Sequence, residues 1–237
     1  MAQVTAGAAT VDCEGSSTRA VNAAIKRHIR EGARDVQVLN PAGHHSLAVA
    51  LKADVRILLE GPVGWYAAGM NYGPHVAVHG NCGWGLAECQ MDGRVEVFGH
   101  AGSGAAASIR GGLVYVERDS GARAGISMKG GTLVVGGSVG YMSGFMMQRG
   151  NMVICGDAAE GLGDSMYDGS IYVGGKVAAF GADAEVRDVT DEDRLFLRET
   201  LNQFGIDAES IDFTKVQSGR KLWNFSTKEP ELWKDAL

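Results

Sequence analysis

One interval of 19 residues organises the middle of this chain. Stepping by 19 from Gly61 reaches a glycine at each position except Arg118: Gly61, Gly80, Gly99, Arg118, Gly137, Gly156 and Gly175. Two residues before each position stands an apolar residue: Leu59, Val78, Val97, Val116, Val135, Ile154 and Val173. Four residues before each stands another: Ile57, Val76, Val95, Val114, Leu133, Met152 and Ile171. Apolar residues two apart indicate a strand with one buried face.

A unit of this length with a single apolar face cannot bury that face alone, so the units must stack on one another. Strands that recur in the same direction pair in parallel, and their connections turn right-handed. We therefore predict an all-β fold, a right-handed parallel β-helix of about seven 19-residue coils over residues 34–186. A calcium-binding nonapeptide repeat and a left-handed hexapeptide helix need other periods. A dinucleotide fingerprint at residues 102–107 lacks the long helix that must follow it.

The strand pattern also separates inward from outward residues. The residue between each apolar pair varies freely: Leu58, Ala77, Glu96, Tyr115, Val134, Val153 and Tyr172. We expect these residues to point outward, so that Val135→Asp is severely destabilising and Val134→Asp is mild unless a partner covers it. A further apolar column, Ile109, Met128, Met147 and Met166, accompanies the later coils.

Glycine is the compositional outlier. Of 35 glycines in 237 residues, 28 lie between Gly61 and Gly175. One column comprises Gly73, Gly93, Gly112, Gly131, Gly150 and Gly169. We expect these glycines to form the corners of the coils, where a tight bend requires a positive φ or little side-chain volume.

The flanks of the repeat each contain a helix. Residues 16–32 predict an amphipathic helix that Ser16, Ser17 or Thr18 caps and Gly32 ends. This segment, residues 1–33, should cap the open end of the β-helix. Val186 should close the last coil. Residues 187–237 then contain a helix that starts at Thr190 and ends at Gly205, followed by an irregular aromatic tail.

Composition limits the location and the partners. The net charge of −6 disfavours a nucleic-acid surface. The sequence shows no signal peptide and no apolar stretch long enough to span a membrane, so we expect a cytoplasmic protein. The four cysteines, Cys13, Cys82, Cys89 and Cys155, form no CxxC pair and are expected to be reduced.

The sequence predicts no catalytic, cofactor-binding or metal site in this chain. Polysaccharide-cleaving β-helices place acids in a groove between long insertions, whereas this coil length is nearly constant. We expect the acids to be spread over solvated surfaces: Glu96, Glu117, Asp119, Asp157, Glu160, Asp164 and Asp168. His44, His45, His75 and His79 lack partners at metal-ligand spacing.

Aromatic side chains next to corner glycines are the candidate interaction residues. Trp65, Tyr66, Trp84, Tyr141 and Phe145 should project from the coil edges, because inward space at a corner is small. We expect them to form an interface with a partner, together with Trp223, Phe225 and Trp233 of the tail. The alternative is that these aromatics pack beneath the chain's own tail.

The columns resemble the GXGXG β-helix domain of the glutamate synthase large chain. The best local match is "GDAAEGLGDSMYDG" (156–169), and "TRAVNAAI" (18–25) and "NPAGHHSLAVAL" (40–51) are similar to the entry of that domain. The resemblance covers roughly residues 15–186. Arg118 departs from the glycine column.

The resemblance implies a non-catalytic scaffold subunit of a heteromeric glutamate-synthase-type enzyme. The stand-alone form is similar to a subunit of methylamine–glutamate N-methyltransferase (N-methylglutamate synthase). The implied partners are a glutaminase-like amidotransferase subunit and a synthase subunit that carries FMN and an iron–sulfur cluster. Two alternatives remain open: a β-helix subunit of another glutamate synthase-like or formylmethanofuran dehydrogenase-like oxidoreductase, and a free-standing β-helix enzyme or binding module.

Overall fold

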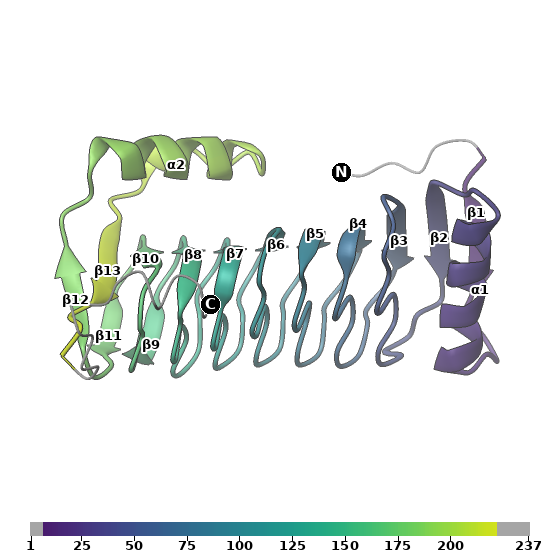
Figure 1. The fold of residues 1–237 in the computed structure, drawn as a ribbon, viewed down its shortest axis with the longest axis horizontal. Coiled ribbons are helices and arrows are strands. Elements are labelled where there is room, and N and C mark those ends of the chain that lie inside the picture. The colour runs from purple at the N-terminus through teal and green to yellow at the C-terminus, as the bar shows by residue number, and fades with distance from the viewer. Residues whose placement is uncertain (1–6, 222–237) are drawn as a thin grey trace, which may run out of the picture.

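The computed structural model describes residues 7–221 and confirms the parallel β-helix (Figure 1). Its main sheet has the order β1-β2-β3-β4-β5-β6-β7-β8-β10-β13-β12, and β9 and β11 form a second, two-stranded sheet. The strands are Ala9–Asp12 (β1), Asp35–Leu39 (β2), Arg56–Glu60 (β3), Tyr72–Val78 (β4), Asp92–Val97 (β5), Leu113–Val116 (β6), Lys129–Val135 (β7), Arg149–Ile154 (β8), Ala158–Leu162 (β9), Ser170–Val173 (β10), Val177–Phe180 (β11), Ala184–Arg187 (β12) and Thr214–Ser218 (β13). The helices are Thr18–Arg30 (α1) and Asp191–Asn202 (α2), with a 3₁₀ turn at Ala208–Ser210 (η1).

The 19-residue period is the register of the sheet. Leu133 pairs with Val114 on one side and Met152 on the other, so each residue of β7 lies beside its equivalents one coil away. Both apolar columns of the strands are buried in one continuous core with the column of Ile109 and Met128. At Arg118, where the corner glycine is missing, the backbone keeps the same coil-to-coil hydrogen bonds to Gly99 and Gly137.

Two kinds of glycine build the corners. The column that contains Gly93 and Gly150 has a positive φ (105° and 97°), as expected. Gly80 and Gly102 do not adopt a positive φ; a Cβ on Gly80 would lie 2.7 Å from the backbone nitrogen of Pro62 in the preceding coil. At these two positions lack of space, not backbone conformation, requires glycine. Alanine accepts a positive φ elsewhere, for example Ala87 at 56°.

The buried column changes from apolar to polar near the N-terminal coils. Asn71, Gln90, Ile109 and Met128 occupy the same position in four successive coils, and the two polar members, Asn71 and Gln90, are also buried. The Asn71 side chain accepts a hydrogen bond from the Leu51 N–H and donates one to the Ala48 carbonyl. These bonds satisfy the backbone of residues 48–51, which form no regular strand.

The N-terminal cap is confirmed and contains one strand more than the sequence predicts. Ser17 caps α1 and accepts a hydrogen bond from the Ala20 N–H, while Val21 and Ile25 are buried. Strand β1 pairs in parallel with β2 and extends the sheet by one position. Figure 1 shows α1 beside β1 and β2 at that end of the row of coils.

The C-terminal end differs from the prediction that Val186 closes the last coil. Strand β13 inserts antiparallel between β10 and β12, so Val186 pairs with Val216 rather than with a parallel strand. A returning antiparallel strand ends the 19-residue progression. No signal in the repeat identifies β13, because neither of its partners, β10 and β12, lies one 19-residue period away in sequence.

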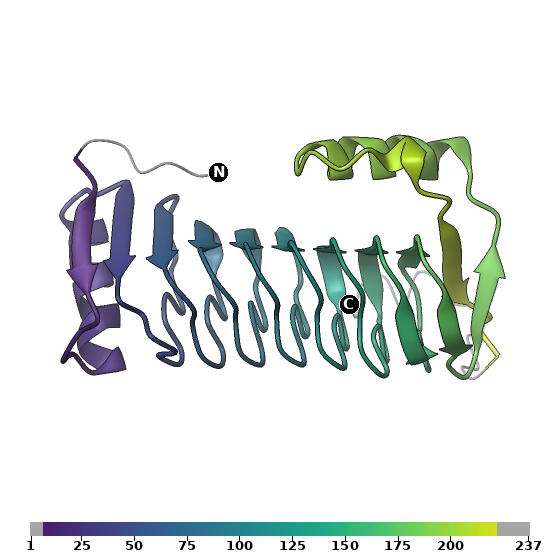
Figure 2. The ribbon, with the colours of Figure 1, turned by 180° about the vertical axis from the view of Figure 1, so that it is seen from behind.

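Helix α2 folds back over the outer face of the sheet. In both views it extends from the β12 end along the coils toward β6 (Figures 1 and 2). Its Leu197 and Leu201, with Phe213, pack on the outward residues Tyr115, Val134, Val153 and Tyr172. Val134 points outward as predicted, but the chain's own C-terminal segment buries it fully, which removes the basis for expecting a mild Val134→Asp. The thermodynamic reason is that a strip of four apolar outward side chains is stabilised by removal from water.

Candidate interaction surface

Four of the exposed aromatic residues, Trp65, Tyr66, Trp84 and Tyr141, lie in the turns of successive coils, outside the main sheet. Tyr72 in β4 and Phe180 in β11 are exposed elsewhere. We call the surface of these turns the turn wall; it comprises residues 45–50, 65–70, 84–89, 103–108, 122–127 and 141–146. In the coil of residues 65–70 the backbone alternates into positive φ at Tyr66, Ala68 and Met70. Its N–H groups therefore point in turn to the next coil and the preceding one: Tyr66 donates to the Trp84 carbonyl and Ala68 to the Leu47 carbonyl. This coil-to-coil bonding holds the turn wall as firmly as a strand.

Three rings form a stacked column on the turn wall, here called the aromatic ladder (His45, Trp65 and Trp84). The centroids of His45 and Trp65 are 4.7 Å apart with planes at 15°, and those of Trp65 and Trp84 are 5.6 Å apart at 17°. The Trp65 backbone N–H donates to His45 Nδ1 at 2.9 Å, which fixes the imidazole in the stack. The two indoles are nevertheless 48% and 58% exposed. The ladder is thus ordered by its own fold and still open to solvent.

The structure brings part of the predicted residue set together. Trp65, Tyr66 and Trp84 lie on adjacent coils, with Tyr66 over Gly85. Tyr141 occupies the ladder position three coils beyond Trp84 and is 52% exposed, while Phe145 of the same coil is partly buried. Four of the five residues are therefore exposed at the coil edges, Phe145 is not, and their contact with a partner stays a prediction. Trp223, Phe225 and Trp233 lie outside the described residues.

Two members of this surface were missed. His45 precedes Trp65 by 20 residues rather than 19, so it falls outside the strict repeat. Met70 is 59% exposed and also belongs to this surface, although it is not an aromatic residue beside a corner glycine.

The outer face of the sheet carries a second set of contacts, between coils and α2. Phe204 stacks on Tyr115 with a centroid distance of 3.8 Å, and the Arg94 guanidinium lies 4.9 Å from the Phe204 ring centroid. Arg94 also donates to the Gln203 side-chain oxygen and pairs with Glu96. The end of α2 is therefore fastened to β5 and β6.

Glu96 is not the solvated acid that the sequence predicts. It is only 8% exposed and accepts hydrogen bonds from His75 and Arg94. Burial alone would raise the pKa of Glu96, but these bonds outweigh it and hold the pKa below its ordinary value. His79 pairs in the same manner with Glu60. These polar groups are engaged with one another across neighbouring coils.

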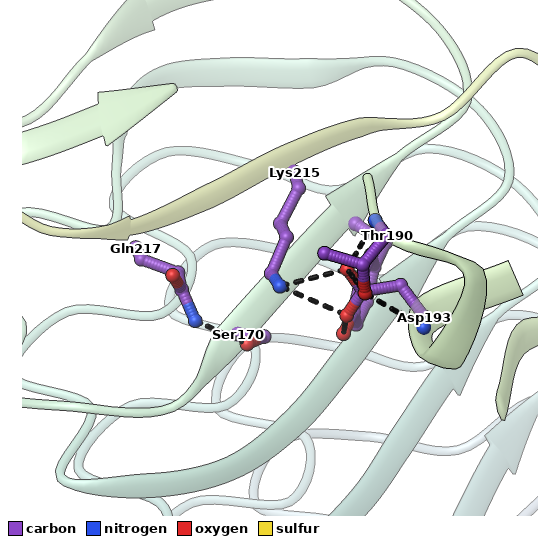
Figure 3. Close-up of polar contacts among 6 residues, drawn as sticks. Ser170, Thr190, Asp193, Lys215 and Gln217 are labelled. Atoms are coloured by element: carbon purple, nitrogen blue, oxygen red, sulfur yellow. Dashed lines mark hydrogen bonds and ion pairs between the residues drawn. The ribbon is translucent and has the colours of Figure 1, made fainter. Parts of the chain in front are cut away.

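The most deeply set ion pair fastens the other end of α2 (Figure 3). Lys215 of β13 donates to both carboxylate oxygens of Asp193, at 2.9 and 2.8 Å. Tyr172 also donates to Asp193, as does Thr190, the N-cap of the helix. Burial would raise the pKa of Asp193, yet the hydrogen bonds from Lys215, Tyr172 and Thr190 hold it well below its ordinary value.

Both carboxylate oxygens of Asp193 accept hydrogen bonds from the chain itself, so we interpret this cluster as a structural contact that holds α2 on the sheet. Beside it, the Gln217 amide donates to the Ser170 hydroxyl (Figure 3).

The four cysteines are free thiols, and burial raises the pKa of Cys155 to about 11 and of Cys82 to about 12. Within residues 7–221 no three His, Cys, Asp or Glu side chains are arranged to hold a metal ion. None of the helices described is long and apolar enough to cross a membrane.

Comparison with known proteins gives one partial match. The chain is 39% identical over 70 residues to Protein GlxC of Rhizobium meliloti (strain 1021). The match covers 29% of this chain and 30% of GlxC, so the aligned part is less than a third of either protein. No family model matches the chain.

Proposed function

We propose that this chain is a non-catalytic scaffold subunit of a heteromeric enzyme related to glutamate synthase. The observation that carries the proposal is the aromatic ladder on the turn wall, ordered within the chain and open to solvent. Exposed, preorganised aromatic groups are typical anchors of protein interfaces. The relationship to glutamate synthase is supported by the GXGXG-like columns and by the partial match to Protein GlxC.

Within this class we propose methylamine–glutamate N-methyltransferase as the enzyme. A glutaminase-like amidotransferase subunit and an FMN-binding synthase subunit with an iron–sulfur cluster would be its cytoplasmic partners. This chain would hold them in register along the coils. The support is the resemblance of residues 156–169 and 18–25 to the GXGXG β-helix domain of the glutamate synthase large chain.

The main alternative within the class is a β-helix subunit of another glutamate synthase-like or formylmethanofuran dehydrogenase-like oxidoreductase. A free-standing β-helix enzyme is less well supported by the geometry. The buried titratable groups Glu96 and Asp193 are committed to partners that fasten α2 to the sheet. A general acid must instead lie within reach of a substrate.

The test is co-expression of this chain with the genes that neighbour its own. We expect a stable complex with glutaminase-like and flavin-containing subunits, and N-methylglutamate formation from methylamine and glutamate. Omission of this chain should abolish assembly of the complex. Complete assembly and full turnover without this chain would overturn the scaffold role. An assembled complex that turns over a different amine or one-carbon substrate would support the alternative oxidoreductase.

A further inference from the structure

The turn wall changes from bulky to small side chains halfway along its length. At the ladder position the order is His45, Trp65, Trp84, Ser103, Ala122 and Tyr141. Because successive coils lie about 4.8 Å apart, Trp84 and Tyr141 are separated by roughly 14 Å of wall that carries only a serine and an alanine at this position. Within the described residues, Trp84 stacks on Trp65, and the next ladder position, Ser103, supplies no ring for its other face. The wall thus has a ridge of rings followed by a notch.

The same change occurs at the other outward positions. One row reads Met70, Cys89, Ser108 and Ser127; the next reads Tyr66, Gly85, Gly104 and Arg123; a third reads Gly69, Glu88, Ala107 and Ile126. When the order is reversed about the midpoint between residues 84–89 and 103–108, a larger residue faces a smaller one at most positions: Trp84 and Ser103, Trp65 and Ala122, Met70 and Ser127, Ile126 and Gly69, Glu88 and Ala107. The exceptions are Tyr66 with Arg123 and His45 with Tyr141, which pair two large side chains.

We propose that a second copy of this chain occupies the turn wall, antiparallel, about a two-fold axis between the coils of Trp84 and Ser103. The axis lies in the plane of the wall, perpendicular to the direction in which the coils stack. Rotation about it reverses the order of the coils, and each row of one copy then faces the same row of the other copy. Trp84 then lies in the notch at Ser103 of the second copy, and Trp65 lies at Ala122. Such an isologous contact closes after two copies.

The remaining juxtapositions agree with this arrangement. Tyr66 faces Arg123 of the second copy, a favourable cation–π pair. Gly85 faces Gly104 at the axis, so neither residue adds a side chain there, and the Tyr66 ring that covers Gly85 becomes part of the contact. Met70 faces Ser127, and His45 faces Tyr141.

The area and charge of the turn wall are those of a dimer interface. Trp65, Tyr66, Met70, Trp84 and Tyr141 are each about half exposed. At roughly 150–250 Å² for a large side chain, they expose on the order of 500 Å² before the smaller residues are added, against about 800 Å² per partner in a standard interface. Glu88 and Arg123 are the only charged residues in the five segments from 65 to 146, and interface cores are poor in charge.

This inference rests on the proposed function only in treating the turn wall as an interface. It assigns the aromatic ladder to a contact between two copies of the scaffold, which leaves the other faces of the coils for the heteromeric subunits. The dimer can be tested with the purified full chain alone. We expect sedimentation equilibrium to show a dimer at micromolar concentration. Ser103→Arg fills the notch and should give a folded monomer whose melting temperature no longer depends on protein concentration. Ala23→Arg, which adds the same charged side chain on the exposed side of α1, is the control and should remain dimeric.

Cross-linking tests the register. In a Cys89→Ser background, the double variant Met70→Cys/Ser127→Cys should oxidise to a covalent dimer, because residue 70 of each copy faces residue 127 of the other. Within one chain these residues are three coils, about 14 Å, apart and cannot form a disulfide. The single variants should not cross-link.

Three outcomes overturn the proposal: a monomeric wild-type chain, a dimer that Ser103→Arg leaves intact, or a Met70→Cys single variant that cross-links as well as the double. A monomer whose Ser103→Arg variant fails to bind the flavin-containing subunit would assign the turn wall to that partner. None of these outcomes bears on whether the chain is required for assembly of the heteromeric enzyme.

Discussion

Whether a strand residue tolerates substitution depends on what covers its side chain, as Val134 and Val135 show. Val135 faces the interior of the coils and Val134 faces α2, and both are fully buried. Adjacent residues of one strand therefore belong to two different cores, one between coils and one between the sheet and the C-terminal segment. Both should be intolerant of charge.

Val134→Asp and Val135→Asp should each destabilise the protein by several kcal/mol, because each buries a carboxylate without a partner. Val186→Asp is the matched control, since Val186 is 55% exposed on β12. Urea unfolding followed by far-UV circular dichroism measures the three variants. A Val134→Asp variant as stable as Val186→Asp would show that α2 does not pack on β7.

Asp193 makes stability depend on acid pH. Its pKa in the folded protein lies below the ordinary value of 3.8, so its charge contributes stability above about pH 4 that is lost as the pH falls through the folded pKa. Asp193→Asn removes this charge and leaves Lys215 without its ion-pair partner, at a cost of about 3 kcal/mol near pH 7. The difference from wild type should shrink as the pH falls below 4.

The control is Asp191→Asn, an exposed acid in the same helical turn. It should cost less than about 1 kcal/mol through the helix dipole alone. Chemical denaturation at pH 7, 5 and 3 supplies the comparison. A constant difference between Asp193→Asn and wild type across this range would contradict the assigned role.

At the scale of the element, the coil is defined by its corners. Gly102 and Gly121 occupy equivalent corners, and a Cβ on either would approach the backbone carbon of the preceding coil's corner at 2.9 Å. At Gly102 the Cβ would also lie 2.6 Å from Trp84 Cδ1. Both sites are therefore crowded by backbone atoms, but only Gly102 is also crowded by an indole ring, that of Trp84.

Gly102→Ala and Gly121→Ala should therefore both destabilise the chain by about 1–3 kcal/mol through overpacking. Gly102→Ala alone should alter the near-UV circular dichroism of tryptophan, because Trp84 must move away from its place on the ladder. Thermal melts and near-UV spectra distinguish the two effects. Identical near-UV spectra for wild type and Gly102→Ala would show that the indole is not fixed as described.

At the scale of the whole molecule, the protein is a row of coils with two differently made ends (Figure 1). At one end α1 and β1 cover the first coil; at the other, an antiparallel strand and a returning helix end the progression. A stack of similar units exposes an apolar end unless a cap covers it. The caps therefore determine whether the molecule stays a discrete particle.

Ile25→Asp should detach α1, since Ile25 is fully buried against the first coils. We expect the variant to keep most of its β-sheet signal but to self-associate end to end, as seen by a rise in static light scattering with concentration. Ala23→Asp, on the exposed side of the same helix, should behave as wild type. Equal scattering from the two variants would contradict the capping role of α1.

The sequence alone determined the coil and the two helices that flank the repeat. In a solenoid, each residue contacts its own equivalent one period away, so the 19-residue columns are already the list of tertiary contacts, as with Leu133 beside Val114 and Met152. The starts of both helices were also predictable from sequence, because Ser17 and Thr190 accept hydrogen bonds from N–H groups in the first turn of their own helices. The aromatic residues beside corner glycines were placed outward for a similarly local reason.

Only the tertiary structure decided what lies on the outer face of the sheet. The pairing of β13 with β10, the burial of Val134 and Glu96, and the ion pair between Asp193 and Lys215 all join segments outside the period to coils within it. Alternation shows that a residue points outward but carries no information about a helix that returns from further along the chain. The stacking of His45 on Trp65 was also hidden, because one additional residue in the first coil removes it from the repeat.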